Sequence, residues 1–302
     1  MKFETKSYKK HQNWYSYLYP DEKSKQERIA IWKCSDTINA WMHRRLYSRL
    51  DAIACKDSKW LTVGDGNGAD AAYLQQKGCD VIASDISGDM LKIAKQEGLI
   101  QKYSVENAEN ISFSDNSFDY VLCKESFHHF PRPWIAFYEM LRVASKGIVL
   151  LEPHDPGIKM PLLVAACNII DRINPILMQK IWKNRYSYET VGNFVFKISE
   201  REIEKAAIGT GMPAVAFNGF NDHYIKGVEN AIAQRGEPLF ARIKQHLWLK
   251  NILTGLHLMP YGVMCAMVFK QKPENKLIGI LKSQKFRFVE FPPNPYLNET
   301  NQ

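Results

Sequence analysis

The fold of this chain is decided by residues 60–70, which read WLTVGDGNGAD. A short apolar run of strand character gives way to closely spaced glycines, and residues 71–77 then have a helical composition that Gly78 ends. Glycine permits positive φ and lets the main chain approach a nucleotide-like group, while N–H groups that open a helix point outward as donors. The stretch therefore predicts a strand–loop–helix unit that binds a ligand through Gly64, Gly66 and Gly68.

A second short strand is expected over residues 81–85, and it ends in the carboxylate of Asp85. Asp85 follows Gly64 by about twenty residues, the spacing at which an acid reaches a pair of ribose hydroxyls. We therefore expect Asp85 to bind a ribose, and we assign Ile86 to the same site. In the alternative interpretation Asp85 caps the next helix, a role for which Ser87 and Asp89 compete.

The segment at 107–123, NAENISFSDNSFDYVLC, is a more specific signal than the glycines. With the glycine loop it resembles the class I S-adenosylmethionine (SAM)-dependent methyltransferases. The resemblance continues through KESFHHF at 124–130, MLRV at 140–143 and GIVLLEP at 147–153, so it covers roughly residues 60–155. A relaxed glycine fingerprint also occurs in NAD-dependent oxidoreductases, but the 107–123 block has no role in that family.

The resemblance implies a Rossmann-like α/β fold with a seven-stranded sheet, in which the seventh strand lies antiparallel between the fifth and sixth. It implies SAM as cofactor and no metal. It also implies that Asn107 and Ala108 lie against the adenine ring and that Lys124 belongs to the cofactor site.

One departure from the family pattern concerns the residue two positions before the first loop glycine. The family usually has Asp or Glu there, whereas this chain has Thr62 and places its acid at Asp65, inside the loop. Either Asp65 binds the methionine ammonium of SAM or that contact is made elsewhere. A non-catalytic cofactor site is the other interpretation.

His128 and His129 are the candidates for the catalytic base, because they follow the fourth strand and an imidazole titrates near neutral pH. Glu152 and His154 are second choices. A His-His-Phe loop is also a structural element in the family, which is the competing interpretation. The motifs for amino methylation of adenine and for carbon-5 methylation of cytosine are absent after the fourth strand, so a hydroxyl is the most economical acceptor.

The chain divides into a helical extension or lid at 1–55, a SAM-binding domain at 56–270 with helical insertions at about 156–195 and 222–258, and a tail at 271–302. A helix is expected from Ser35 or Asp36 to about Ala54, and Tyr15 and Tyr17 before it either fold over the site or pack in the core. Further elements are expected in this order: a partly buried helix at 160–170 that walls the acceptor pocket, a helix at 200–207 opened by a Ser199–Glu202 capping box, a strand at 214–220, helices at 225–234 and 238–253, a strand at 261–269, and an edge strand at 285–291.

The composition, 45% hydrophobic and 24% charged over 302 residues, predicts a cytoplasmic enzyme with a full hydrophobic core. The sequence has no pattern typical of a secretory signal, no uninterrupted apolar run long enough to span a membrane, and no Cys-x-x-Cys pair. An interfacial membrane helix at 160–170 is an alternative to a buried one. The net charge of +8 is modest and dispersed, so the chain favours a small-molecule or glycan acceptor over RNA. An RNA methyltransferase and a SAM-binding protein without turnover are the other hypotheses, and the oligomeric state is left open.

Overall fold

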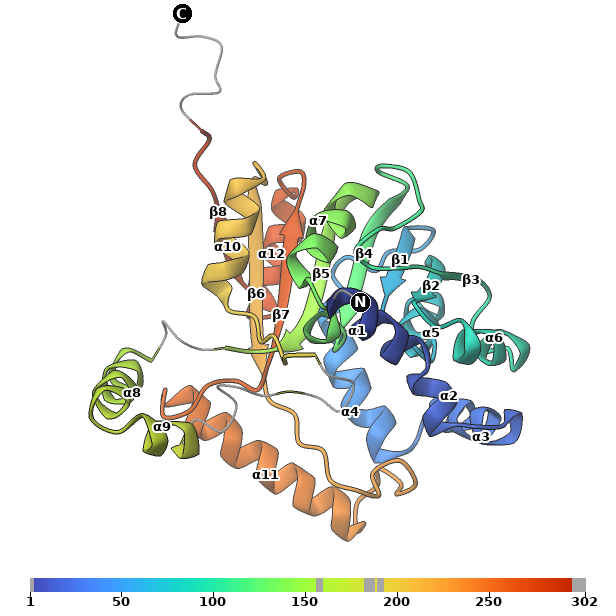
Figure 1. Ribbon diagram of the computed structural model, residues 1–302, viewed down its shortest axis with the longest axis horizontal. Coiled ribbons are helices and arrows are strands. Elements are labelled where there is room, and N and C mark those ends of the chain that lie inside the picture. The colour runs from blue at the N-terminus through green and yellow to red at the C-terminus, as the bar shows by residue number, and fades with distance from the viewer. Residues whose placement is uncertain (1–2, 156–159, 182–187, 189–192, 295–302) are drawn as a thin grey trace, which may run out of the picture.

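One eight-stranded sheet forms the centre of the computed structural model, which describes residues 3–155, 160–181, 188 and 193–294 (Figure 1). The strand order is β3-β2-β1-β4-β5-β7-β6-β8. The strands are β1 (Lys59–Val63), β2 (Asp80–Asp85), β3 (Tyr103–Val105), β4 (Phe118–Lys124), β5 (Ala144–Pro153), β6 (Ala214–Phe220), β7 (Val263–Phe269) and β8 (Arg287–Glu290).

The first five strands are parallel, and β7 lies antiparallel between β5 and β6. The expected Rossmann-like class and the place of the seventh strand are confirmed. The strand count differs by one, because β8 pairs with β6 as the edge strand expected in the tail.

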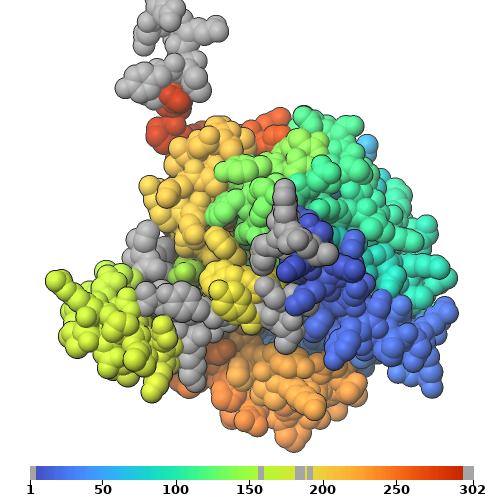
Figure 2. Space-filling view, viewed as in Figure 1, coloured from blue at the N-terminus to red at the C-terminus, as the bar shows by residue number. Residues whose placement is uncertain are grey.

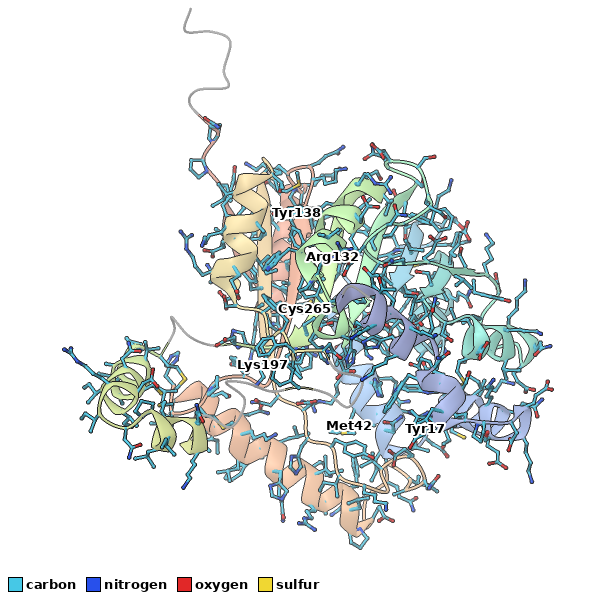
Figure 3. All side chains as sticks on the ribbon, in the orientation of Figure 1. Tyr17, Met42, Arg132, Tyr138, Lys197 and Cys265 are labelled. Atoms are coloured by element: carbon cyan, nitrogen blue, oxygen red, sulfur yellow. The ribbon has the colours of Figure 1, made fainter. Side chains whose placement is uncertain are left out.

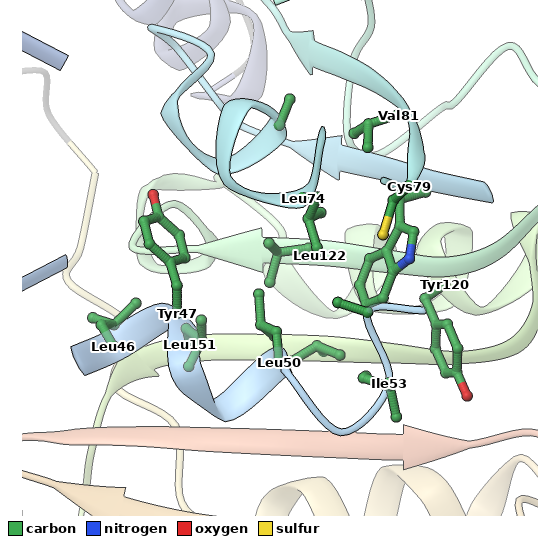
Figure 4. Packing of buried hydrophobic residues seen from close by; sticks show 14 of the residues in the cluster. Leu46, Tyr47, Leu50, Ile53, Leu74, Cys79, Val81, Tyr120, Leu122 and Leu151 are labelled. Carbon is green, nitrogen blue, oxygen red and sulfur yellow. The ribbon is translucent and has the colours of Figure 1, made fainter. Parts of the chain in front are cut away.

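Helices cover both faces of the sheet, so the strands are apolar on both sides. Along β4, Tyr120 and Leu122 pack into one core cluster while Val121 and Cys123 pack into the other. Figure 4 shows the first cluster, where Tyr47, Leu50 and Leu74 meet Leu122 and Leu151. Its helices are α3 (Glu22–Lys33), α4 (Ile38–Tyr47), α5 (Ala69–Gln76), α6 (Asp89–Gln96) and α12 (Asn275–Ser283), and the opposite face carries α7 (Pro133–Val143) and α10 (Glu200–Gly209).

Four helices precede β1, beginning with α1 (Phe3–Gln12) and α2 (Trp14–Leu18). The helix expected to start at Ser35 or Asp36 and reach Ala54 is shorter: α4 is capped by Thr37, whose Oγ1 accepts from the Ala40 N–H at 3.1 Å. It passes into a 3₁₀ turn, η1 (Ser48–Leu50). Burial of Leu50 and Ile53 in the core favours this tighter end.

Three further helices lie in the second half of the chain: α8 (Pro161–Ile173), α9 (Pro175–Ile181) and α11 (Pro238–Gly255). The capping box at Ser199 is confirmed as the start of α10. The expected helix at 225–234 is wrong, because Val228 and Ala231 give their carbonyls to the N–H groups that open α4, and Gly227 has φ +104°. Segment 275–283, expected as loose tail, is helical.

The helix expected at 160–170 is present but is mostly exposed, and its place beside the acceptor pocket stays a prediction. None of the residues of α8 is buried, and none lines either of the two cavities described below. Among the described residues, no helix is both long and apolar enough to cross a membrane. All six cysteines are free thiols.

Candidate functional site

The carboxyl ends of β1, β2, β4 and β5 meet at one edge of the sheet, where the sequence-predicted site residues come together. Gly64 has φ +73°, and a Cβ on it would lie 2.5 Å from the Cβ of Ser126. The Ser126 hydroxyl donates to the Gly64 carbonyl at 2.7 Å. The glycine loop is therefore bound directly to the loop after β4, and only glycine fits at this contact.

Asp65 lies buried inside the glycine loop and holds its shape. Its carboxylate accepts from the N–H groups of Asp70 and Ala71 at 3.2 and 2.9 Å, and from the Thr62 hydroxyl at 2.9 Å. Burial and the nearby charge of Asp70 raise the pKa of Asp65 to about 7. In this structure Asp65 caps the start of α5, and its proposed contact with the methionine ammonium stays a prediction.

The first cavity, of about 540 Å³, contains both expected adenosine contacts. Asp85 lines it at the end of β2, and one of its oxygens accepts from the Ser87 N–H at 2.8 Å. Burial raises the pKa of Asp85 to about 6. Ile86, Asn107 and Ala108 line the same cavity. Asp85 does not cap α6, whose N-cap is Gly88.

A second cavity, of about 520 Å³, opens on the other side of the glycine loop. Lys124 lines it and places its ammonium 2.9 Å from Glu125 and 3.6 Å from Asp70. Burial lowers the pKa of Lys124, but these two carboxylates outweigh burial and raise it overall. Lys124 in turn lowers the pKa of Glu125 to about 2. The two carboxylates thus favour the charged form of Lys124, whereas burial raises the pKa of Asp70.

The two cavities meet at Tyr15, Gly64, Glu125 and Ser126, which line both of them. Tyr15, on α2, fills the space that a Cβ on Gly66 would need. Burial and the charges of Asp85 and Asp65 raise the pKa of the Tyr15 phenol. Its position at the junction explains why Gly66 is required.

The loop after β4 is organised by Glu152, which is fully buried at the end of β5. One carboxylate oxygen accepts from the N–H groups of Ser126 and Phe127 at 2.8 and 2.9 Å, and the other lies 2.6 Å from Nδ1 of His128. His128 is therefore oriented by Glu152. His129 lines the first cavity.

The N-terminal helices cover this edge of the sheet. The Tyr8 hydroxyl of α1 donates to Glu109, whose carboxylate also accepts from the main chain and side chain of Arg132 at 2.7 and 2.6 Å. Ser16 of α2 donates to Asp89 at 2.7 Å. Figure 3 labels Arg132 beside α1, and these contacts fasten α1 and α2 over the first cavity.

Sequence reasoning missed His43 and Trp32, which line the second cavity. Their rings are in edge contact with centroids 4.7 Å apart. Nδ1 of His43 and Nε1 of Trp32 are buried without a hydrogen-bond partner among the described residues. Burial, with the charge of Lys124, lowers the pKa of His43 to about 3. A neutral imidazole without a partner is suited to accept a hydrogen bond from a ligand.

The described residues fit a SAM molecule. Asp85 is a partly buried carboxylate that lines a cavity and forms no ion pair with any described side chain, and an oxygen not used by Ser87 is available to ribose hydroxyls. Ile86 and Ala108 supply apolar surface for the adenine. No group of three His, Cys, Asp or Glu side chains in the described segments is arranged to hold a metal.

The chain is similar in sequence to known methyltransferases. Residues 61–151 match the family model described as "Methyltransferase domain". The chain is 35% identical over 113 residues to methyltransferase GfsG of Streptomyces halstedii, covering 35% of this chain and 40% of that protein. It is 32% identical over 114 residues to a demethylmenaquinone methyltransferase of Paenarthrobacter aurescens, covering 37% of this chain and 45% of the relative. The matches to these two relatives thus span less than half of their lengths.

Among solved structures, the chain is similar to the YcgJ protein of Bacillus subtilis, with 17% identity, 76% of this chain and 100% of that chain covered, and a TM-score of 0.49. A SAM-dependent methyltransferase of Archaeoglobus fulgidus gives 16% identity, coverage of 76% and 92%, and a TM-score of 0.46.

Proposed function

We propose that this chain is a class I SAM-dependent methyltransferase that transfers a methyl group from SAM to a hydroxyl of a small-molecule or glycan acceptor, a proposal supported by the match of residues 61–151 to a methyltransferase domain. The observation that carries the proposal is the joint placement of Asp85 and Asn107 in one cavity beside the glycine loop. Asp85 and Ile86 would hold the ribose, and Asn107 and Ala108 the adenine.

The glycine loop would border the methionine end, because Gly64 lies where the first cavity meets the second, and Lys124 would approach that end from the second cavity, which it lines. When bound, SAM supplies an electrophilic methyl group on its sulfonium. The chain itself supplies alignment, which is worth on the order of 7–11 kcal/mol, and exclusion of water by α1 and α2. A base adds about a hundred- to ten-thousand-fold in rate.

We assign proton removal to His129, because it lines the first cavity together with Glu125 and Ser126, which also border the second. Its neighbour His128, oriented by Glu152, is the other candidate base. The acceptor would occupy the second cavity up to its junction with the first, where Nε1 of Trp32 can donate to one of its oxygens and neutral His43 can accept a hydrogen bond from a hydroxyl other than the one that is methylated.

Cofactor binding is tested by isothermal titration of the full chain with SAM and with its demethylated product. We expect Asp85→Ala to weaken both by at least about tenfold, the cost of losing a hydrogen bond to a charged group. Asp80→Ala is the matched control, because Asp80 lies exposed at the other end of β2 in an ion pair with Lys102. No binding by the unsubstituted protein would overturn the proposal.

The acceptor is tested with radiolabelled SAM and cell extract separated into RNA, lipid, carbohydrate and small-molecule pools. We expect label in the carbohydrate or small-molecule pool. His129→Ala should lower the rate about a hundredfold or more while the affinity for SAM changes less than twofold. Label confined to RNA would exclude the proposed acceptor class.

A further inference from the structure

An apolar stripe is exposed along α8 and α9. Leu162, Ile169 and Ile173 of α8 are 86%, 59% and 77% exposed, and Ile176 at the start of α9 is 69% exposed. Residues spaced by three, four and seven positions share one face of a helix, so the three α8 side chains form a continuous stripe. Figure 2 shows α8 and α9 as a lobe that projects from the body of the molecule.

A second apolar stripe runs along α11. Trp248, Ile252 and Leu256 are four residues apart and are 67%, 38% and 63% exposed. The other face of α11 is buried, since Phe240 and Leu247 pack in a cluster with Ile38 of α4. The helix therefore has two apolar faces, and only one of them is covered by described residues.

The charge around these stripes is almost entirely positive. The three helices contain the exposed basic side chains of Arg172, Lys180, Arg242 and Lys244, whereas their only acidic residue is Asp171. Lys244 lies one turn before Trp248 on the same face of α11. Over the whole chain the balance is 40 basic to 32 acidic residues, so the basic character of these helices is local.

We propose that the exposed faces of α8, α9 and α11, here called the α8–α11 surface, bind an anionic phospholipid bilayer from its surface. The aliphatic stripes would enter the boundary between headgroups and acyl chains, with Trp248 at the headgroup level and the basic side chains on lipid phosphates. A second copy of the chain is disfavoured as the occupant, because two such surfaces would bring like charges together.

The buried face of α11, opposite the α8–α11 surface, packs next to the candidate site, and no residue of α8, α9 or α11 lines either cavity. Phe240 of α11 stacks edge-on against Trp41 of α4 with ring centroids 5.0 Å apart, and α4 contributes Met42 and His43 to the second cavity. Met42 is labelled on α4 in Figure 3. Lipid binding is independent of the proposed chemistry and can be measured without it.

The test is co-sedimentation of the full chain with phosphatidylcholine vesicles prepared with and without phosphatidylglycerol. We expect binding to the anionic vesicles that falls as salt is raised. Trp248→Gln and Leu162→Gln/Ile173→Gln should each weaken binding by at least about tenfold, and Arg242→Gln and Lys244→Gln by about fivefold each.

The matched control is Ile135→Gln/Tyr138→Gln on α7, whose side chains are 40% and 47% exposed on a different helix. It should bind vesicles as the unsubstituted chain does. Thermal unfolding and size-exclusion chromatography of every variant separate lost binding from misfolding. The proposal is overturned by equal binding to both kinds of vesicle, by no binding, by surface variants that bind normally, or by a lipid-free dimer that Trp248→Gln dissociates.

Discussion

Asp65 is buried and Asp85 is partly buried, and neither carboxylate pairs with a cation in the described structure. The pKa of each is raised, so both change charge closer to neutral pH than an ordinary aspartate. Their neighbours differ. Asp85 faces a cavity and keeps an oxygen for a ligand, whereas Asp65 is surrounded by the donors of its own loop. Protonation of Asp85 should therefore control the affinity for SAM, and protonation of Asp65 should control the free energy of unfolding.

SAM affinity should fall as pH decreases below about 6, because protonated Asp85 can no longer accept hydrogen bonds from both ribose hydroxyls. We expect the dissociation constant to rise about tenfold per pH unit in that range. Titration calorimetry between pH 5 and 8 measures it. Asp85→Asn should bind weakly with a flat profile, and a wild-type slope in that variant would contradict the assignment.

Folding stability should decrease as pH rises from about 4 to 7. The pKa of Asp65 is about 7 in the folded state against 3.8 for an unperturbed aspartate, so the folded state binds more protons in that window. The free energy of unfolding should fall by about 2–4 kcal/mol across it. Urea unfolding at several pH values checks this. Asp65→Asn should flatten the dependence, while Asp80→Asn should not.

At the scale of elements, the placement of α1 and α2 decides access to the first cavity. Their fastening points are Tyr8 on Glu109 and Ser16 on Asp89, and Tyr15 lies over Gly66 between them. This arrangement favours the lid interpretation of the N-terminal aromatics for Tyr15. Tyr17 of the same helix is 79% exposed and takes no part in it.

Tyr15→Ala should weaken SAM binding by about tenfold and speed amide hydrogen exchange in the glycine loop, because it uncovers the loop and enlarges the junction of the two cavities. Tyr17→Ala, on the same helix, is the matched control. Titration calorimetry measures the affinity for SAM, and hydrogen-exchange mass spectrometry measures the exchange of the glycine loop. Identical behaviour of the two variants would leave Tyr15 with a packing role alone.

The elements that could be predicted are those with local signals. The strand–glycine–helix unit at 60–76 and the capping box at Ser199 depend on residues close in sequence. The contact of Tyr8 with Glu109 and Arg132 could not be predicted, because 101 positions separate Tyr8 from Glu109 and no sequence periodicity relates them. His43 is a lone histidine on an amphipathic helix, which by itself indicates only packing. The degree of exposure of the 160–170 helix could not be predicted, because an apolar sequence fits a buried helix and an exposed one equally well.

At the scale of the whole molecule, the contact of β5 with β7 joins the parallel strands to the antiparallel ones. Gly147 of β5 pairs with Phe269 of β7, and a Cβ at Gly147 would overlap the Val268 carbonyl. The sheet can stay continuous here only with glycine on β5. This contact also sets the position of Glu152, five residues along the same strand.

Gly147→Ala should therefore lower the free energy of unfolding by about 1–3 kcal/mol or more, because the obstructing atom is backbone and cannot rotate away. Gly279→Ala in α12, where nothing lies within 4 Å of the added methyl, should instead raise it by about 0.5–1 kcal/mol. Denaturant unfolding of both variants measures the contrast. Equal stability of the two would show that β5 and β7 can separate at little cost.

The fastening of α1 to the loop at Glu109 has a kinetic consequence. A demethylated nucleoside product in the first cavity would contact Tyr8 and Tyr15, which line it, and we expect outward motion of α1 and α2, on the microsecond-to-millisecond scale or slower, to precede its release. Turnover should then slow in viscous solvent, and accumulated product should compete strongly with fresh donor, even though neither effect involves the reacting atoms.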